Sequence, residues 1–408
     1  MNTAVNVDNQ NSTAIPTEAE LVSRARALIP MLLDRAESVE KARMVSSDTI
    51  QQFVEAGFFK ILQPKAFGGW EMSPSVFYKV LMELGRGCPS SGWNMMILGI
   101  HQWEFGGLDV QAGNDVWGQD NAVVIASSYP PFGKVDPVEG GYLLNGTWRT
   151  SSGCDHGQWA FLGGVLFDDA GQPSDRCSFL VSRENYEIVD DWYTFGLAGT
   201  GSKSLVVKDA FVPYHRMHSL IRYEQGDRPL NYKFPFNQVF FASVSAVIIG
   251  MAQGAIDEYI KQMKVRKNTT GGDAAALSPY VTDRLGNASV RVRSARARLL
   301  QMIDESYAYL ERGELVPTYE RVHHMLDIAR VGRDCEEAVM LLFKATSARG
   351  IFLSNPLQRI VRDVVAGTNH ITQNADDTAG MLGAYLLGQE LPPMIFGLEA
   401  VSMPSDVG

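Results

Sequence analysis

Three short runs decide the fold that this sequence predicts: Trp-Ala-Phe-Leu at 159–162, Ser-Phe-Leu-Val at 178–181 and Ser-Leu-Val-Val at 204–207. They are rich in β-branched and aromatic residues, and similar runs stand at 123–125 and 142–144. Turn residues separate them at 140–141, 168–171 and 199–201. Strands of this length with turns at this spacing indicate a small antiparallel barrel or sandwich between about residues 122 and 217.

Both flanks of this β-rich segment show the helical period instead. Before it, apolar residues recur at three- and four-residue steps from Leu21 to Leu32, which makes one apolar face. After it, long amphipathic segments with short connections, at 243–267, 278–313, 319–350 and 355–385, predict a four-helix bundle. The chain is therefore expected to be mostly α with a central β-domain. The expected divisions are a disordered lead-in at 1–16, an N-terminal helical domain at 17–119, a β-barrel domain at 120–228 and a C-terminal helical bundle at 229–408.

Composition narrows the function classes. The chain has 408 residues, 45% of them hydrophobic, and a formal net charge of −10, and no stretch gathers basic residues, so a nucleic-acid partner is not expected. The four cysteines have neither zinc-ligand nor disulfide-framework spacing, which indicates reduced thiols in a cytoplasmic protein and no metal site. The longest apolar stretch, 239–252, is shorter than the roughly 20 residues of a bilayer-spanning helix, so no membrane contact is expected.

The order of helices, small β-domain and helical bundle is uncommon, and particular motifs accompany it. The segment Gln-Pro-Lys-Ala-Phe-Gly-Gly at 63–69 is similar to the early proline to Gly-Gly turn of the acyl-CoA dehydrogenase superfamily. Arg266, at an expected helix end, resembles the arginine of that superfamily that reaches the flavin of a neighbouring subunit. The segment 356–363, with Pro356, Arg359, Arg362 and Asp363, resembles its late proline–arginine–aspartate helix. The resemblance covers nearly the whole chain and implies the acyl-CoA dehydrogenase fold and a homotetramer.

Within that superfamily the chain more closely resembles the oxygenase components of two-component aromatic hydroxylases, such as 4-hydroxyphenylacetate 3-hydroxylase. The resemblance rests on the order and spacing of the segments 93–101, 127–134, 151–156, 186–193, 201–203 and 367–370. It implies a flavin-dependent monooxygenase that uses O₂ and reduced flavin, FADH₂ or FMNH₂, to hydroxylate a small aromatic substrate through a C4a-hydroperoxyflavin. No Gly-x-Gly-x-x-Gly follows a strand, so the reduced flavin is expected from a separate NAD(P)H–flavin reductase.

Two histidines are the first candidates for catalysis. His370 stands where the dehydrogenases place or neighbour their catalytic glutamate, yet the tract 366–374 contains no Asp or Glu. An imidazole there suits holding or deprotonating a phenolic or indolic substrate, or donating a hydrogen bond to a flavin peroxide. A structural histidine at a helix start is the alternative. His101 lies in an aromatic-rich stretch, where a satisfied core histidine is usual. In the hydroxylases that the chain resembles, this position faces the substrate hydroxyl.

Hydroxyl residues make up much of the flavin site that the resemblance implies. It places Ser127 near the substrate and Ser152 near flavin N5, both as catalytic candidates, while ordinary turn chemistry is the alternative for such serines. The polar Gly-rich loop that holds Thr200 and Ser202 is suited to bind a phosphate through backbone N–H groups. The expected cofactor-binding set also contains Trp93, Ser128, Ser151, Arg266 and Asn374.

The expected substrate pocket is lined by Trp103, Gln238, Phe240 and Phe241. No Lys or Arg occurs between 233 and 261, where hydroxyphenylacetate-type relatives are expected to carry an arginine; Arg149 and Arg349 could supply a cation from elsewhere. Because a buried carboxylate without a partner is costly, a neutral aromatic substrate is expected, with indole first and a simple phenol second. The alternatives are an acyl-CoA dehydrogenase-like flavoprotein and a thiophene- or nitroalkane-type oxygenase of the same fold.

Overall fold

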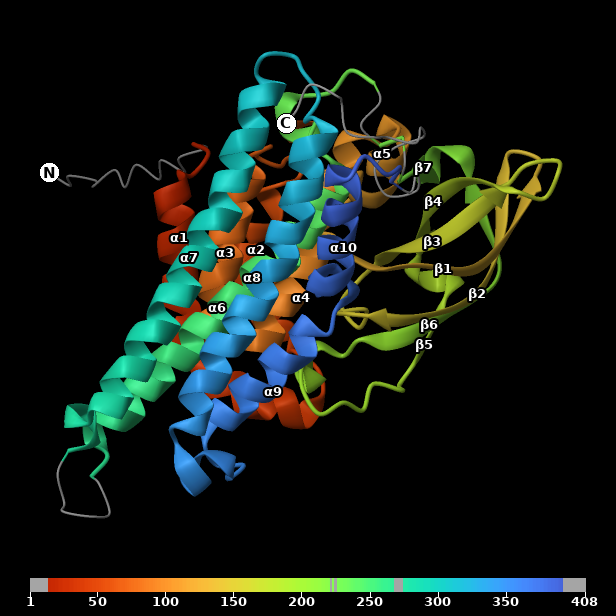
Figure 1. Cartoon of the computed structure of the whole chain (residues 1–408). Coiled ribbons are helices and arrows are strands. Elements are labelled where there is room, and N and C mark those ends of the chain that lie inside the picture. Colours follow the sequence, from red (N-terminus) through yellow and green to blue (C-terminus); the bar gives the residue numbers. More distant parts are fainter. Residues whose placement is uncertain (1–13, 221, 224–225, 268–273, 392–408) are drawn as a thin grey trace, which may run out of the picture.

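The structure is a computed structural model that describes residues 14–220, 222–223, 226–267 and 274–391 (Figure 1). Positions 1–13 of the expected lead-in lie outside the described residues. The N-terminal helices are α1 (Glu18–Ala42), α2 (Ser47–Glu55), α3 (Pro74–Gly87), α4 (Pro89–Ile100) and α5 (Val110–Trp117). Side-chain caps fix two of the starts. Thr17 and Glu20 form a capping box before α1, and Ser46 accepts the Thr49 N–H before α2.

The central part is one sheet of seven described strands in the order β5-β6-β2-β1-β3-β4-β7. All five expected β runs fall in or at the start of a strand, whereas the two three-residue strands β5 and β7 were not expected. The pairing of β1 with β3 is parallel, which differs from the antiparallel arrangement expected. The strands are β1 (Ile125–Val138), β2 (Gly141–Ser151), β3 (Trp159–Phe167), β4 (Pro173–Ser182), β5 (Glu187–Val189), β6 (Lys203–Pro213) and β7 (Met217–Ser219).

Strand β1 joins two halves of this sheet. Its first residues, from Ile125 to Ser128, pair with β3, and its last, from Lys134 to Val138, pair with β2. The register shifts between Ser128 and Gly133, so the strand changes partner there. Strand alternation places Ser127 and Tyr129 on one face and Ser128 on the other. Strand β1 contacts α4, and its Tyr129 hydroxyl lies 3.0 Å from Nδ1 of His101 at the end of that helix.

The C-terminal part is helical again, with α6 (Phe236–Val265), α7 (Pro279–Leu310), α8 (Thr318–Lys344), α9 (Pro356–Thr368) and α10 (Ala375–Leu386). The expectation of one helix over 355–385 is wrong, because α9 ends at Thr368 and α10 begins at Ala375. The break is stabilised by two caps: His370 accepts the Thr372 N–H, and Asn374 accepts the Asp377 N–H. Figure 1 shows α10 on the side of the bundle that faces the sheet.

Helix α6 is the central helix of the bundle. It packs against α3, α7, α8 and α9. Among the described helices it is the one long and apolar enough to cross a membrane, so the expectation that its apolar stretch is too short does not hold. Its most apolar window is 83% buried inside the fold, as in a core helix that is apolar on all sides.

Candidate active site

Helix α4 carries both ends of the candidate site. Trp93 is its fifth residue, at the start of the second turn, and His101 follows its last residue. Eight residues separate them, which is about 12 Å along the axis, with the two side chains about 80° apart around it. A Cβ at Gly92 would lie 2.7 Å from the backbone of Gly85, so this glycine lets α4 start close against α3. The helix thus presents an indole and an imidazole about two turns apart on one side.

A chain of buried hydroxyls meets Trp93. Its indole N–H donates to Ser152 Oγ at 3.1 Å, and Ser152 Oγ lies 2.7 Å from Ser202 Oγ. Ser202 Oγ in turn lies 2.7 Å from Thr200 Oγ1, which donates to the Leu197 carbonyl at 2.7 Å. We refer to Ser152, Ser202 and Thr200 as the hydroxyl chain. Four residues expected at the flavin therefore lie together, from α4, the end of β2 and the loop before β6.

The loop that carries Thr200 and Ser202 is held by α9. Asp363 Oδ1 accepts the Leu197 N–H at 2.6 Å, and Leu197 has a left-handed backbone with φ 51°. A Cβ at Gly196 would lie 2.1 Å from the Arg362 carbonyl, so the loop touches the helix backbone. Burial raises the pKa of Asp363 to about 7, although the Leu197 N–H works against that shift.

His370 lies between α9 and α10, beside Trp93. The two ring centres are 5.8 Å apart at 68°, an edge-to-face contact. Its Nδ1 accepts the Thr372 N–H at 3.4 Å and lies 2.9 Å from the Thr372 hydroxyl, so the structural role as a cap is present. Its Nε2 has no hydrogen-bond partner among the described residues. Burial lowers the pKa of His370 to about 4, so the imidazole is neutral at pH 7.

His101 belongs to a second buried group. Its Nδ1 lies 2.7 Å from Glu104 Oε1, and the other oxygen of Glu104 lies 2.6 Å from His218 Nε2. The Tyr129 hydroxyl donates to Glu104 Oε1 and lies 3.0 Å from His101 Nδ1. We refer to His101, Glu104, Tyr129 and His218 as the carboxylate–histidine cluster. Burial alone would raise the pKa of Glu104, but hydrogen bonds from His101 and His218 outweigh it and hold the pKa below its ordinary value.

Aromatic rings surround the His101 imidazole. The ring centres of Phe240, Tyr129 and Phe161 lie 5.6, 5.7 and 5.8 Å from it. Trp103 lies behind Phe240, 6.2 Å away, and stacks on Tyr223. His101 is fully buried, and its Nε2 has no hydrogen-bond partner in the described part of the chain. An unpartnered buried polar atom costs about 1–3 kcal/mol, a cost that a bound ligand would remove.

Among the buried polar groups that lack a partner in the described part of the chain, two belong to elements of this site. Both side-chain atoms of Asn94 are unpaired, and so is the Ser151 hydroxyl. Asn94 precedes His101 by seven residues, two helical turns, so it lies on the same side of α4. Ser151 ends β2, directly before the hydroxyl chain. A flavin offers ring nitrogens, carbonyls and a phosphate, so these unpaired groups together with the hydroxyl chain fit that cofactor.

The two serines of β1 differ. Ser127 shares the face of Tyr129 and makes no hydrogen bond with another described residue, so its hydroxyl is available near the carboxylate–histidine cluster. Ser128 points to the opposite face and donates to the Arg149 carbonyl at 2.6 Å. Ser128 therefore belongs to the sheet and does not join the residues around Trp93 or His101.

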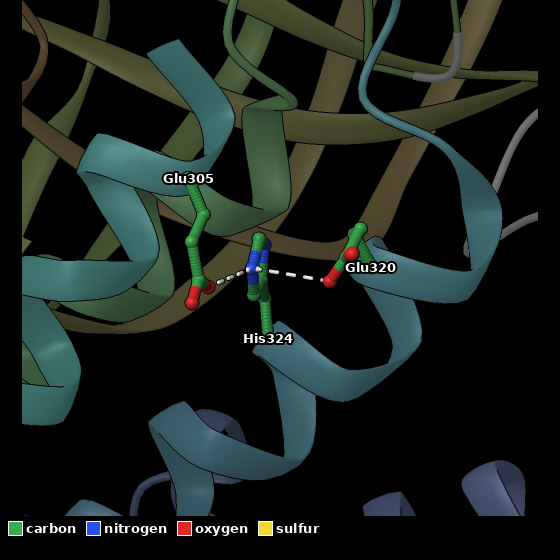
Figure 2. A group of neighbouring side chains, drawn as sticks. All are labelled: Glu305, Glu320 and His324. Carbon is green, nitrogen blue, oxygen red and sulfur yellow. Dashed lines mark hydrogen bonds and ion pairs between the residues drawn. The ribbon is translucent and has the colours of Figure 1, made fainter. Parts of the chain in front are cut away.

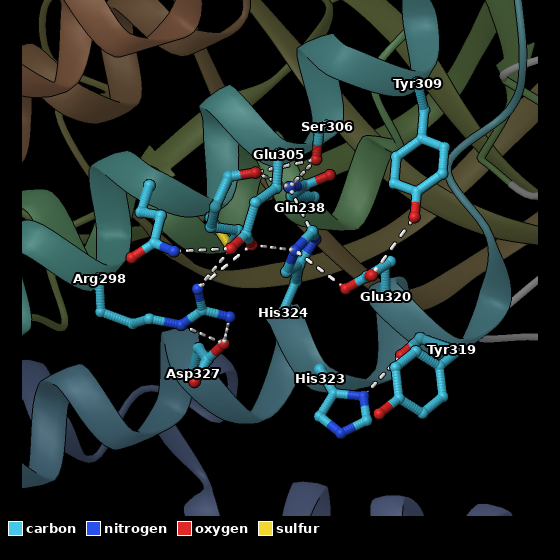
Figure 3. Close-up of polar contacts among 12 residues, drawn as sticks. Gln238, Arg298, Glu305, Ser306, Tyr309, Tyr319, Glu320, His323, His324 and Asp327 are labelled. Carbon is cyan, nitrogen blue, oxygen red and sulfur yellow. Dashed lines mark hydrogen bonds and ion pairs between the residues drawn. The ribbon is translucent and has the colours of Figure 1, made fainter. Parts of the chain in front are cut away.

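Two residues expected in the substrate pocket lie elsewhere. Gln238 donates to Ser306 Oγ at 2.7 Å and lies 3.2 Å from His324 Nδ1, inside the helical bundle (Figure 3). Phe241 packs against a small cluster of α8 and α10 that includes Met325 and Tyr385. Around a helix axis Phe241 lies about 100° and Gln238 about 200° from Phe240, so neither shares the face by which Phe240 contacts His101.

The network around Gln238 contains three metal-ligand residue types. His324 Nε2 lies 3.1 Å from Glu305 and 4.0 Å from Glu320 (Figure 2). Arg298 already pairs with Glu305 at 3.0 Å, and both glutamates are about a third exposed. A metal ion would have to displace this pairing, so we interpret the group as an ion-pair network between α7 and α8, the helices that carry its members.

The remaining cofactor candidates cap helices. Arg266 ends α6 and donates to the Ala345 and Thr346 carbonyls at 3.3 and 3.5 Å. This end of α6 lies at the lower left of Figure 1, away from the sheet, so Arg266 does not join the residues around Trp93. Asn374 caps α10 and lines, with His370, a surface pocket of about 570 Å³ between α8, α9 and α10.

Sequence reasoning missed Glu104, Tyr129, His218 and Asn94. The His-x-x-Glu spacing at 101–104 was a usable signal, because residues three apart meet on one helical face. Tyr129 could also have been proposed, because it follows Ser127 by two residues and so lies on the same face of a strand. His218 lies on a three-residue strand that no local pattern marks, and its distance from Glu104 in the chain gives no hint of contact.

Comparisons with known proteins agree with this geometry. Residues 16–111 match the family model "Acyl-CoA dehydrogenase, N-terminal domain", and residues 242–375 match "Acyl-CoA dehydrogenase, C-terminal domain". The flavin-dependent monooxygenase oxygenase subunit HsaA of Rhodococcus jostii is 37% identical over 371 residues, which are 89% of this chain and 97% of that protein. The p-hydroxyphenylacetate 3-hydroxylase oxygenase component of Acinetobacter baumannii is 30% identical over 384 residues, 91% of this chain and 90% of that protein.

A solved structure is equally similar. The 3-HSA hydroxylase from Rhodococcus sp. RHA1 superposes with a TM-score of 0.87 at 35% identity, covering 92% of this chain and 99% of that chain. The chain therefore belongs to the flavin-dependent monooxygenases that have the acyl-CoA dehydrogenase fold. Within that class it is an oxygenase component of the kind represented by HsaA. The fold expected from the sequence is confirmed.

Proposed function

We propose that this oxygenase component hydroxylates a small neutral aromatic compound, a simple phenol ahead of indole. The observation that carries the proposal is His101 Nε2, which is buried, unpaired among the described residues and surrounded by aromatic rings. A phenol has an ordinary pKa near 10, as in tyrosine, so a well-oriented imidazole is able to take its proton. An indole N–H serves only as a donor, and the order expected from the sequence is therefore reversed.

The hydroxyl chain and its neighbours are the groups proposed to hold the flavin. Trp93 and His370 offer ring faces, while Ser151 and Asn94 offer unpaired hydrogen-bonding atoms. Reduced flavin, FMNH₂ or FADH₂, supplies the electrons with which O₂ is activated. Relatives are named as oxygenase subunits or components, which supports a separate reductase as the source of that flavin. The buried aromatic surroundings of His101 exclude water from the reacting ring.

The charges near the site support a neutral substrate. Arg149 and Arg349, the cations that the sequence left open, are both exposed. Arg228 lies over the Tyr223 ring, 4.4 Å from its centre, on the side of the molecule where Tyr223 stacks on Trp103. An acid substrate would need Arg228 to leave that ring. A neutral aromatic substrate is therefore proposed first. If aromatic acids are hydroxylated, Arg228 is the residue to examine as the partner of their carboxylate.

The decisive experiment supplies chemically reduced FMN or FAD, O₂ and one aromatic at a time. Phenol, indole and 4-hydroxyphenylacetate are compared, and the products are identified by mass. The expected result is a hydroxylated product with phenol, a smaller yield with indole and little with the acid. A strong preference for 4-hydroxyphenylacetate would overturn the proposal that the substrate is a neutral aromatic. Oxidation of an acyl-CoA with an artificial electron acceptor, without aromatic product, would favour the dehydrogenase alternative instead.

We also propose a homotetramer in the cytoplasm. Arg266 lies away from the flavin candidates of its own chain, which fits a role toward a second copy. Near it, the corner between α8 and α9 exposes three large apolar side chains, Ile351, Phe352 and Leu353. All four cysteines are buried and free, in keeping with a reducing compartment.

A further inference from the structure

We propose that Glu104 and His218 are positioning residues of the hydroxylation, which fix His101 as a neutral base with its lone pair on Nε2. The inference rests on the proposed function and adds to it the device that sets the state of His101. Glu104 lies in the short helix Trp103–Gly106, His218 in β7 and Tyr129 in β1, so three separate elements converge on one carboxylate. The Glu104 side chain is fully buried.

The partners of each nitrogen decide where the protons are. An ionised carboxylate only accepts hydrogen bonds, so His101 Nδ1, at 2.7 Å, must donate to Glu104. The neutral imidazole then has its lone pair on Nε2, the atom without a partner among the described residues. Glu104 therefore selects one tautomer of His101, as the buried aspartate does in the Ser-His-Asp triad.

His218 differs from His101 because both of its nitrogens meet acceptors. Its Nε2 lies 2.6 Å from Glu104 Oε2, and its Nδ1 lies 3.3 Å from the Ser219 carbonyl. Both contacts are hydrogen bonds only when both nitrogens of His218 carry protons, and we therefore assign the imidazolium form to it in this proposal. Its positive charge balances the buried carboxylate, which would otherwise be costly to bury. With His218 as the countercharge of Glu104, the carboxylate needs no second positive charge from a proton on His101 Nε2.

This division of charge defines the proton step. The O–H bond of a bound phenol breaks, its proton forms a bond to His101 Nε2, and the electron pair stays on the phenolate oxygen. The phenolate then lies beside the new imidazolium of His101, so the pair has no net charge. Besides Glu104 and the two histidines, the ionisable groups named at this site are Tyr129, Tyr223 and Arg228: Tyr129 donates to Glu104, Tyr223 donates to the Trp103 carbonyl at 3.1 Å, and Arg228 covers the Tyr223 ring.

A Glu104→Gln variant tests the device, because an amide has one acceptor and one donor side and cannot accept from both histidines. The probe is 4-cyanophenol, whose phenol and phenolate absorb at different wavelengths, bound to the anaerobic complex with reduced flavin. Without O₂ no turnover occurs, so the spectrum reports only the ionisation of the bound ring. In the wild type the midpoint of ionisation should lie at least one pH unit below that of the free probe, a tenfold effect.

The expected result for Glu104→Gln and for His218→Gln is a midpoint that returns toward that of the free probe, with hydroxylation slowed about 10²–10⁴-fold. Glu104→Asp keeps the charge and should restore part of both effects. Tyr129→Phe is the matched control, because it removes one hydrogen bond to Glu104 and leaves both histidine contacts. It should change the midpoint less than Glu104→Gln does.

Two failures are distinguishable. If the wild type hydroxylates no phenol, the proposed function fails and this inference fails with it. If the wild type hydroxylates phenol but a folded Glu104→Gln variant has the wild-type midpoint and rate, the inference alone is overturned. Circular dichroism and bound-flavin content establish folding, and a misfolded Glu104→Gln leaves the decision to His218→Gln, for which the same outcomes apply.

Discussion

His370 combines two roles that a single alanine substitution cannot separate. Its Nδ1 caps the turn Ile371–Gln373, and its ring lies edge-on to Trp93. The backbone at this position is extended, with φ −63° and ψ 140°, which is the ordinary conformation of an N-cap. Asparagine is among the best N-cap residues, so it can keep the cap while removing the imidazole.

We predict that His370→Asn keeps the stability of the wild type, whereas His370→Ala lowers the free energy of unfolding by about 0.5–2 kcal/mol through loss of the cap. Both variants should lose hydroxylation about 10²–10⁴-fold, with oxygen consumption diverted to hydrogen peroxide. His101→Ala should show the same diversion. Urea denaturation measures the first effect, and the ratio of product to O₂ consumed measures the second. Normal coupling in His370→Asn would refute a chemical role for the ring.

At this scale the grouping of the candidates for the flavin site followed from the sequence better than the grouping of those for the substrate pocket. Trp93, Ser152, Thr200 and Ser202 could be found because motifs carry them, and the structure brings them together. Gln238 and Phe241 were proposed beside Phe240 although the helical period alone separates them. Glu104 was not proposed, because a buried carboxylate is recognisable only by its partners. One of these partners, His218, is 114 residues away in the chain.

At the scale of elements, the close approach of β1 and β3 fixes the place of Tyr129. A Cβ at Gly163 of β3 would lie 1.9 Å from the Tyr129 carbonyl, so only glycine allows this spacing. The parallel pairing of these strands also depends on it, because Phe161 and Leu162 pair with Ser127 and Ser128. The position of Tyr129 against Glu104 therefore depends on a residue in the neighbouring strand.

We predict that Gly163→Ala moves β1, lowers the free energy of unfolding by about 1–3 kcal/mol and weakens coupling of O₂ use to product. Gly286→Ala in α7 is the control, because nothing lies within 4 Å of its Cβ and alanine is the better helix former. That variant should gain up to about 1 kcal/mol. Thermal unfolding and product yield are the measurements, and equal behaviour of the two variants would contradict the argument.

The stability that Asp363 contributes where α9 contacts the loop of the hydroxyl chain should depend on pH. In the folded protein burial raises the pKa of Asp363 to about 7, whereas an unfolded aspartate has a pKa near 3.9. The protonated carboxyl is thus favoured by folding. Its contribution to stability is fully present below about pH 4 and is lost as the pH rises to about 7.

We therefore predict that Asp363→Asn, which keeps an acceptor for the Leu197 N–H, gains stability relative to the wild type as the pH rises from 5 to 8. The relative gain should be on the order of a few kcal/mol. Urea denaturation of both proteins at the two pH values gives this difference. A difference between the proteins that is the same at pH 5 and pH 8 would show that Asp363 does not titrate in this range.

Element boundaries were predictable where local chemistry sets them. The starts of α2 and α4 follow from Ser46 and from Pro89. The break between α9 and α10 was missed, because Asn369 to Asn374 interrupts no apolar period and its two caps act only once the turn has formed. The parallel pairing of β1 with β3 was missed for a related reason: register between distant strands depends on packing that no local pattern records.

At the scale of the whole molecule, the exposed corner between α8 and α9 is the feature to test for assembly. Ile351, Phe352 and Leu353 are 64–81% exposed, and burying them would stabilise an interface by roughly 25 cal/mol per Å². We predict a homotetramer by light scattering, and a smaller species when Phe352 and Leu353 are both replaced by aspartate. A stable wild-type monomer with full activity would count against the proposed assembly.

If a separate reductase supplies the flavin, as proposed from the names of the relatives, reduced flavin is a diffusing substrate of this protein. We predict that the purified protein is nearly colourless and binds reduced flavin more tightly than oxidised flavin. Anaerobic and aerobic titrations with FMN and FAD measure the two dissociation constants and show which flavin is used. Equal constants for the two redox states would contradict the prediction.

The central place of α6 has a consequence for synthesis of the chain on the ribosome. The helix is complete at Val265, but α8 and α9, which cover it, end only at Lys344 and Thr368. At about 5–20 residues per second, the roughly 100 residues in between take on the order of 5–20 s. For that time the sides of α6 that α8 and α9 bury are uncovered, although α3 is already made, so chaperones should bind there and the yield at high expression rates should depend on them.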